Sequence, residues 1–452
     1  MDYRWRVTAV FLLGFFLDCI NIFMSAIALP DVAQTMAVGP SLIGWVGNAY
    51  ILGLVVVMPI STWLSGYLGT RRLLVLSMLL FSVAVLACGY ADSFAGLIVW
   101  RFIQGLGGGL LIPVGQALVF NLFPGAQRGR VSTVIMATAL IAPAFSPTLG
   151  GIIVDHGSWR WVFFANVPFS LLAAVLAWLW IEKGRGAQVA KPDLKGLILI
   201  GLVLASVLIA LSLYADRGFR TGVVAGLAAA LVCGAAYWFH HKKTRNPIVD
   251  ISLMGNRRLA VAMLVYHAVP GVFTGVNLTA IFYFQTVLGF SAQSTGQFML
   301  FYAAGALVAM VAGQRVSASL GSRFLLAVGI TLHSIGIVCL VGVHAADQVP
   351  LLIAAYTMMG VGGGLSANTA QTIALLDFKG RHMEQGSVIW NLNRQIAFSL
   401  GVAAMTLVLA LVKRWLPAIS PYPATFLFAT VLCLSALCVL PSLSPLLLER
   451  KS

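Results

Sequence analysis

A single arginine lies inside a long apolar run, Leu97 to Gly109 (LIVWRFIQGLGGG), which contains no acidic residue. A guanidinium stays protonated at physiological pH, and burying it in hydrocarbon is costly unless a partner compensates its charge. On a helix, Arg101, Gln104 and Gly108 fall on one face at i, i+3 and i+7. This face combines a fixed charge, an amide and a surface small enough for close backbone approach, which indicates a polar functional site inside an apolar protein.

Asp18 is the only acidic residue that we place deep in any of the first six predicted helices. Counting about 1.5 Å per residue, it lies roughly 16 Å from one membrane edge, and Arg101 lies roughly 9 Å from the other. In an apolar core about 30 Å thick these depths differ by about 5 Å, so the two side chains can meet. A carboxyl group under the opposing influences of burial and a nearby arginine can load and release a proton. The alternative is a static buried ion pair.

A second polar cluster, Trp390 to Gln395 (WNLNRQ), lies in another apolar run. Asn391, Arg394 and Phe398 share one helix face, which we expect to point into the protein as a substrate contact or as a polar clamp between helices. His267 can titrate near neutral pH, although hydrogen-bonded packing is the alternative. We expect the substrate cavity to be lined by polar and aromatic residues: Asn21, Trp45, Asn48, Tyr50, Gln104, His267, Asn277, Asn391 and Arg394, with Tyr283 and Gln285 as further candidates.

The composition is typical of an integral membrane protein. The 452 residues are 60% hydrophobic and only 9% charged, and several apolar runs exceed about 18 residues. A net charge of +15 could indicate nucleic-acid binding. The basic residues, however, cluster in short gaps between apolar runs, where lysine and arginine determine the orientation of a protein in the membrane. We predict a lipid bilayer and a small-molecule substrate as partners, no nucleic acid, and a monomer.

No metal-ligand cluster, phosphate-binding loop or nucleophile elbow is visible in the sequence. The six cysteines lie in or beside apolar runs and none forms a CxxC pair, so no metal site or disulfide framework is indicated. We therefore predict no enzyme activity, no catalytic residue and no cofactor.

The apolar runs predict an all-α membrane protein with fourteen transmembrane helices. The predicted ranges are 7–30, 42–64, 72–91, 95–122, 131–154, 161–181, 195–214, 221–240, 259–287, 294–316, 323–343, 349–373, 386–412 and 423–447. Most of the 28 lysines and arginines then fall on the side that holds the N-terminus, which the positive-inside rule makes cytoplasmic. We expect a multi-pass protein of the plasma or inner membrane with both termini in the cytoplasm.

An internal repeat divides the chain. GLGGGL at 105–110 recurs as GVGGGL at 360–365, and LGTRRLL at 68–74 recurs as LGSRFLL at 320–326. The spacing fits eight helices, so we predict two six-helix bundles, residues 1–185 and 246–452, with two inserted helices in 186–245 that pack outside and face lipid. A parallel repeat of this kind places a substrate site between the bundles near the bilayer midplane. In the second copy of the repeat, Tyr356 occupies the position that corresponds to Arg101. Because the charge is present in one copy only, we favour a functional role for the arginine.

These residues resemble the major facilitator superfamily, in particular its fourteen-helix drug:proton antiporter branch, over nearly the whole chain. The superfamily's helix 4 motif, L-x-x-x-R-x-x-Q-G-x-G, is met by Leu97, Arg101, Gln104, Gly105 and Gly107. Further similarities lie in Trp45 to Tyr50, in SPTLGG at 146–151, in SWRWVFFANVP at 158–168 and in GSVIWNLNRQ at 386–395. The resemblance implies secondary transport by alternating access, with a proton gradient as the energy source. Proline and glycine in the fifth helix are expected to kink it and to form a hinge: Pro143, Pro147, Gly150 and Gly151.

The sequence departs from the family pattern at two places. In the loop between helices 2 and 3, the gating loop, Gly69, Arg71 and Arg72 are present, but Thr62 replaces a glycine and Gly66 replaces an aspartate. In the first helix Asn21 stands at the position of the family's aspartate, whereas Asp18 lies one turn earlier on the same face. The resemblance places the proton-carrying carboxyl group at the position now held by Asn21, and we predict that Asp18 takes over this role together with Arg101. How the altered loop controls conformation stays open.

Three functions remain at this point. The first is a proton-coupled exporter of amphipathic toxic compounds, such as drugs and antibiotics. The second is a facilitator or symporter dedicated to an anionic metabolite or siderophore, because a buried guanidinium such as that of Arg394 suits a carboxylate or phosphate. The third is a membrane sensor or scaffold, which usually carries a sizeable soluble domain that this sequence does not contain.

Overall fold

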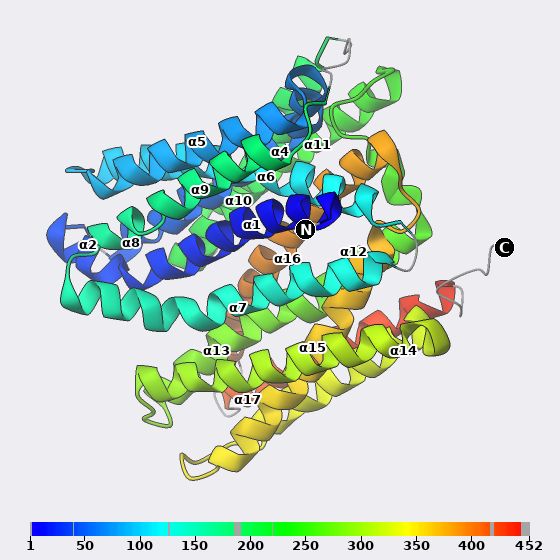
Figure 1. The fold of residues 1–452 in the computed structure, drawn as a ribbon. Helices are drawn as coiled ribbons and strands as arrows, with labels where there is room; N and C mark the ends of the chain where they lie inside the picture. The colour runs from blue at the N-terminus through cyan, green and yellow to red at the C-terminus, as the bar shows by residue number, and fades with distance from the viewer. Residues whose placement is uncertain are drawn as a thin grey trace. The chain divides into compact units, whose positions relative to one another are not determined.

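The computed structural model describes residues 2–38, 40–124, 127–184, 191–218, 220–415 and 420–443, and these residues form helices joined by short connections (Figure 1). The chain up to the inserted pair forms α1 (Tyr3–Ile27), α2 (Leu29–Thr35), α3 (Pro40–Ile43), α4 (Trp45–Leu68), α5 (Thr70–Gly89), α6 (Phe94–Leu122), α7 (Gln127–His156), α8 (Arg160–Phe164) and α9 (Val167–Trp180). The inserted helices are α10 (Leu194–Arg217) and α11 (Thr221–Lys243).

The remaining helices begin with η1 (Ile251–Gly255), α12 (Arg257–Tyr266), η2 (His267–Gly271), α13 (Val272–Thr286) and α14 (Ala292–Val341). They continue with α15 (Val349–Ala374), α16 (Gly380–Trp415), α17 (Pro421–Ser435) and η3 (Ala436–Ser442). The turn η2 is a π-helix that contains Pro270. Proline cannot donate an intrahelical hydrogen bond, and π-turns inside a longer helix often accompany functional sites.

Thirteen helical segments among the described residues are long and apolar enough to cross a membrane. They correspond to thirteen of the fourteen ranges predicted from the sequence. The fourteenth range, 131–154, lies in α7, which is a continuous helix of 30 residues but has several residues whose side chains are outside the described set. The structure therefore confirms an all-helical membrane protein, while the count of fourteen stays a prediction.

The helices form two compact units. The first contains Met1–Pro124, Ile141–Ile251 and Phe378–Leu392, and the second contains Gly125–Leu140, Ser252–Asp377 and Asn393–Ser452. Both α7 and α16 are divided between the units, α7 after Leu140 and α16 after Leu392. The predicted division into 1–185, 186–245 and 246–452 follows the repeat in the sequence and is not tested by these units.

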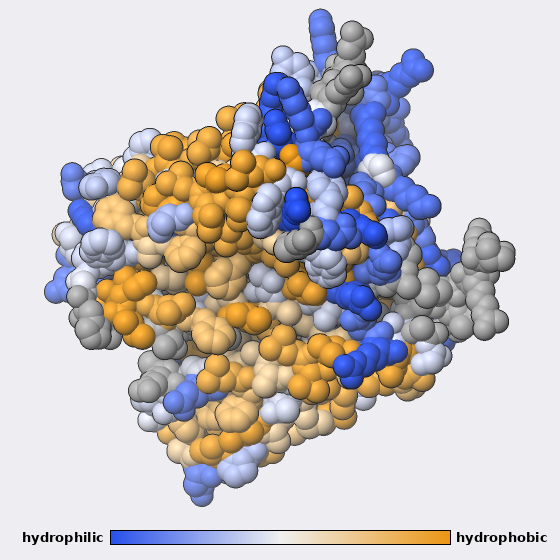
Figure 2. Space-filling model, viewed as in Figure 1, coloured by the Kyte–Doolittle hydropathy of each residue, from blue (hydrophilic) through white to orange (hydrophobic). Residues whose placement is uncertain are grey.

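The inserted helices lie at the surface of the first unit. Helix α10 packs on α4 and on α11, and α11 leaves large apolar side chains uncovered, with Leu231 76% and Val232 70% exposed. Helices α5 and α9 of the same unit also expose large apolar side chains on their outer faces. Figure 2 shows an apolar surface of this kind, with hydrophilic side chains at the helix ends. Exposed apolar side chains on long helices are what a lipid environment requires.

The two copies of the sequence repeat form the same kind of close contact between two helices. A Cβ atom on Gly105 of α6 would overlap the Tyr50 carbonyl oxygen of α4, and one on Gly360 of α15 would overlap the Tyr302 carbonyl oxygen of α14. Only glycine permits this close backbone approach. The connection before α5 and the break within α14 also match, because Gly69 has φ 82° and Gly321 has φ 74°. Both glycines come from the repeated LG-[TS]-R segment.

This packing predicts a contrast between two glycines of the first unit. Gly105→Ala should lower the melting temperature of the detergent-solubilised protein, because overpacking costs about 1–3 kcal/mol. Gly47→Ala, on α4 with open space around its Cβ position, should be neutral or slightly stabilising, because alanine favours a helix by about 1 kcal/mol over glycine. Thermal unfolding followed by size-exclusion chromatography measures both. Equal melting temperatures for Gly105→Ala and wild type would contradict the close approach of α4 and α6.

Candidate functional site

Arg101 is completely buried in the first unit, and α1, α4 and α6 all supply its partners. Its Nε donates to the Val46 carbonyl oxygen at 2.8 Å. One terminal nitrogen donates to the side-chain oxygens of Asn21 and of Gln104, the latter at 2.9 Å. The other donates to the Ser25 hydroxyl at 3.1 Å. Each of the three guanidinium nitrogens thus has at least one acceptor, as a permanent charge in an apolar interior requires.

Tyr50 connects Arg101 to Asp18. The guanidinium lies over the Tyr50 ring, with 4.6 Å between Cζ and the ring centroid, a favourable cation–π geometry. The hydroxyl of the same tyrosine donates a hydrogen bond to Asp18 Oδ1. Both Tyr50 and Asp18 are buried. The two groups predicted to couple protons are therefore joined through one aromatic side chain.

Gly108 provides the space for this arrangement. A Cβ atom at this position would lie 2.8 Å from Asp18 Oδ1 and 2.9 Å from the Tyr50 hydroxyl oxygen. The glycine on the arginine face of α6 therefore makes room for the carboxyl–tyrosine pair. Two buried amide nitrogens beside it, Asn21 Nδ2 and Gln104 Nε2, have no hydrogen-bond partner within the described part of the chain. They are donors that water or a bound molecule can engage.

The other candidates in the first unit are less closely joined to this cluster. Trp45 and Asn48 are partly exposed near the start of α4. Asn391 is buried on α16 and donates to Gln116 Oε1 of α6, to which Ser387 Oγ donates at 3.1 Å. Sequence reasoning did not single out Gln116 or Ser387. Ser387 lies one turn before Asn391, a spacing that could have marked it.

In the second unit the repeat reproduces the scaffold without the charge. Tyr356, at the position of Arg101, donates to Asn277 Oδ1 at 3.2 Å, as Arg101 donates to Asn21. Tyr302, at the position of Tyr50, stacks on Phe273 with 4.0 Å between ring centroids, where Tyr50 meets a carboxyl group. This half of the repeat is therefore neutral at the corresponding place.

The remaining predicted residues of the second unit separate into interior and surface positions. His267, in the π-turn, lies 3.0 Å from Asn393 Oδ1 through its Nε2. Arg394 is 6% exposed on α16. Tyr283 donates to the Val343 carbonyl oxygen at 2.7 Å. Gln285 is exposed near the end of α13 and does not line an interior site in this structure.

The predicted hinge and gating loop are only partly described. Pro143, Pro147 and Gly151 lie in α7, but their side-chain surroundings are outside the described residues, while Gly150 is buried. In the loop, Gly69 has a positive φ of 82°, which favours glycine. Arg71 lies over the Trp178 ring, 4.4 Å from its centroid, and Arg72 is exposed. The loop therefore has a defined turn, and one of its arginines packs on α9.

A further polar group in the second unit was not found from the sequence. Arg128 of α7 is buried and donates to the carbonyl oxygens of Leu375 and Leu376 at 2.7 Å. One turn further along α7, Ser132 and Thr133 bond to Gln371 and Asn368 of α15. The acceptors of Arg128 are backbone carbonyl oxygens just after α15. Every residue has such an oxygen, so the sequence could not identify these partners.

Comparison with known proteins identifies the family. The family model described as Major Facilitator Superfamily matches residues 11–402. The multidrug resistance protein B homolog of Mycobacterium tuberculosis is 31% identical over 387 residues, which cover 84% of this chain and 70% of the relative. The multidrug resistance protein Stp of the same organism is 28% identical over 411 residues, 90% of this chain and 75% of the relative.

Solved structures agree on the fold. The human organic anion transporter MFSD10 superposes with a TM-score of 0.69 at 15% identity, over 97% of this chain and all of that one. Identity this low supports the fold alone. The helix 4 motif, the repeat and the family match converge, and the resemblance drawn from the sequence is confirmed: the chain belongs to the Major Facilitator Superfamily and is a secondary transporter, not an enzyme.

Proposed function

We propose that this transporter is a proton-coupled exporter of amphipathic toxic compounds that works by alternating access. Its relatives in Mycobacterium tuberculosis carry the name multidrug resistance proteins. In this proposal α7 is the fourteenth transmembrane helix, both termini are cytoplasmic, and the protein is a monomer in the plasma or inner membrane. The positive-inside distribution of lysine and arginine supports the orientation.

The observation that carries the proposal is the buried Asp18–Tyr50–Arg101 cluster. Arg101 keeps its charge throughout a transport cycle, whereas Asp18 can be ionised or neutral. When ionised, the carboxylate accepts the Tyr50 hydrogen bond and compensates the nearby guanidinium. When protonated, it leaves the positive charge of Arg101 uncompensated, which favours a different arrangement of the helices. Proton binding and conformation are then linked through one side chain.

The second candidate is a transporter for an anionic metabolite or siderophore. Arg394 is the observation in its favour, because this arginine is 6% exposed on α16 and a guanidinium binds carboxylate and phosphate well.

Transport by the purified protein in liposomes separates the two candidates. We expect ethidium to be transported when a pH gradient is imposed and to stop when the gradient is collapsed. Citrate, phosphate and a ferric siderophore provide the anion panel. Transport of an anion without transport of ethidium would favour the second candidate, a symporter if that transport needs the pH gradient and a facilitator if it does not.

The first functional prediction concerns the carboxyl group. Asp18→Asn nearly preserves the shape of the side chain but removes its titratable proton. Gradient-driven ethidium transport should therefore fall to the level of empty liposomes, while ethidium binding in detergent, followed by fluorescence, is retained. The double variant Asp18→Asn/Asn21→Asp restores a carboxyl one turn away, about 4.5 Å along the same face, and should recover part of the coupling. Normal transport by Asp18→Asn with unchanged pH dependence would move the coupling group elsewhere, His267 being the next candidate.

The second functional prediction concerns the tyrosine that joins the charged groups. Tyr50→Phe keeps the ring under Arg101 and removes the hydrogen bond to Asp18, so the initial rate of ethidium transport should fall about tenfold or more, as expected for one hydrogen bond to a charged group. Tyr302→Phe is the matched control, because Tyr302 occupies the corresponding position in the second unit, where it stacks on Phe273. A similar loss in both variants would indicate general damage rather than a role for the Asp18 contact.

A further inference from the structure

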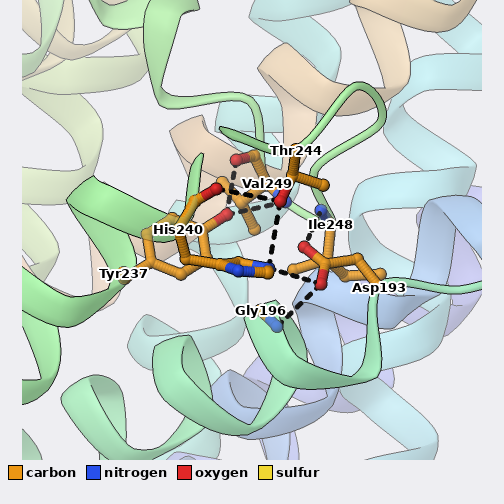
Figure 3. A network of polar contacts seen from close by, with 7 residues as sticks. All are labelled: Asp193, Gly196, Tyr237, His240, Thr244, Ile248 and Val249. Carbon is orange, nitrogen blue, oxygen red and sulfur yellow. Dashed lines mark hydrogen bonds and ion pairs between the residues drawn. The ribbon is translucent and has the colours of Figure 1, made fainter. Parts of the chain in front are cut away.

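The connection between α11 and η1, residues 244–250, is held by side chains in and next to the inserted helices (Figure 3). Asp193 lies just before α10, which it caps by accepting from Gly196 N at 2.8 Å. The same carboxylate lies 2.7 Å from His240 Nε2 and accepts from Ile248 N at 3.3 Å. We call residues 244–250 the connector. Asp193 therefore ties both inserted helices to it.

Tyr237 of α11 makes a second attachment to the connector. Its hydroxyl donates to the Val249 carbonyl oxygen at 2.6 Å and accepts from Val249 N at 3.1 Å. One residue further along, Asp250 lies 3.2 Å from His241 Nε2. The backbone of Val249 thus has both of its polar groups satisfied by one side chain of the inserted pair.

The electrostatics of Asp193 agree with a firm attachment. Its side chain is 7% exposed, and this burial raises the pKa of the carboxyl group. The hydrogen bonds from Gly196, His240 and Ile248, together with the charge of His240, outweigh burial and hold the pKa below its usual value. The carboxylate is therefore ionised at neutral pH and keeps these three contacts.

Gln385 of α16 receives the connector on its other side. Its Oε1 accepts from Asp250 N at 3.1 Å, and its Nε2 donates to the Ile248 carbonyl oxygen at 3.2 Å. The same Nε2 donates to Thr62 Oγ1 of α4 at 3.2 Å. Gln385 is 6% exposed. One amide therefore joins the connector, α16 and α4 inside the first unit.

The segment of α16 that carries Gln385 is the one that departs from its own repeat. Residues 378–392 belong to the first unit, whereas α16 from Asn393 onward belongs to the second. Besides Gln385, the segment is held by Ser387 and Asn391, which donate to Gln116 of α6. Alternating access moves one repeat against the other, so these contacts between α16 and helices α4 and α6 are ones that must break during a cycle.

We propose that the inserted helices α10 and α11 control the release of residues 378–392, which contain the start of α16, from the first unit, acting through the connector and Gln385. The proposal rests on the proposed function insofar as it assumes alternating access, and it adds a role for the inserted pair. Asp193 and Tyr237 fix the connector, the connector positions both polar atoms of Gln385, and Gln385 positions the α16 segment. Gln385 and Tyr237 act by holding other segments in place, because both bond to the connector and neither belongs to the Arg101 cluster.

Hydrogen–deuterium exchange of the purified full-length protein tests the proposal without requiring transport. Tyr237→Phe removes two hydrogen bonds to the connector and keeps the ring, and Gln385→Met keeps the length of the side chain and removes its polar atoms. Each should raise the exchange rate of peptides from 378–392 about two- to tenfold, the factor expected for losing a net hydrogen bond from the closed state. Tyr214→Phe is the matched control, because this buried tyrosine lies near the other end of α10.

Thr62→Val separates the two sides of Gln385. It removes only the α4 acceptor and should raise exchange in 378–392 while leaving that of the connector unchanged. Faster exchange in the connector alone after Tyr237→Phe would overturn the proposal, because the inserted helices would then not act on α16. Equal effects of Tyr214→Phe and Tyr237→Phe would also overturn it. The exchange assay needs no transport and the Asp18 mechanism is tested by gradient-driven transport in liposomes, so the two can fail independently and their failures are distinguishable.

Discussion

The first unit is built around a permanent positive charge that cannot leave the apolar interior. Arg101 is satisfied only because a carbonyl oxygen of α4, two amides and a hydroxyl of α1 and α6 surround it, and an aromatic ring lies beneath it. These groups reach it because Gly105 lets α6 approach α4 within backbone contact. Removing any partner would leave a buried charge or donor unsatisfied, which is more costly than losing an ordinary contact. The positions of α1, α4 and α6 therefore follow from one guanidinium.

The two copies of the repeat share their helix packing but differ in the charged side chains at corresponding positions. Both units keep the glycine-rich helix, the tyrosine packed against it and a hydrogen bond from the Arg101 position to an asparagine on a neighbouring helix. Only the first unit adds the carboxyl and the guanidinium, whereas the second has Phe273 and Tyr356 in their places. In the proposed function the titratable carboxyl lies in the first unit, and the corresponding place in the second unit carries neutral side chains. This division suits a transporter whose halves differ in role while sharing a fold.

The helices were predictable because each is an apolar run bounded by charged or turn-forming residues, and the structure places thirteen of them as expected. The arginine cluster was partly predictable, since helical spacing put Gln104 and Gly108 beside Arg101 and Asn21 beside Asp18. The Val46 carbonyl and the carbonyls that receive Arg128 were not, because a backbone acceptor depends on helix register rather than residue type. Gln385 and the connector were missed for a related reason. Their contacts join segments far apart in the chain, and each residue alone is an ordinary polar residue near a helix end.

The most direct test of the account is the number of protons released when a ligand binds. Purified wild-type protein in weakly buffered detergent solution, with a pH indicator present, should release protons when ethidium is added, because binding and a protonated Asp18 compete through the same cluster. Asp18→Asn should bind ethidium and release none, while Tyr302→Phe should behave as wild type. Proton release from Asp18→Asn equal to that of wild type would contradict the assignment of proton coupling to the Asp18–Tyr50–Arg101 cluster.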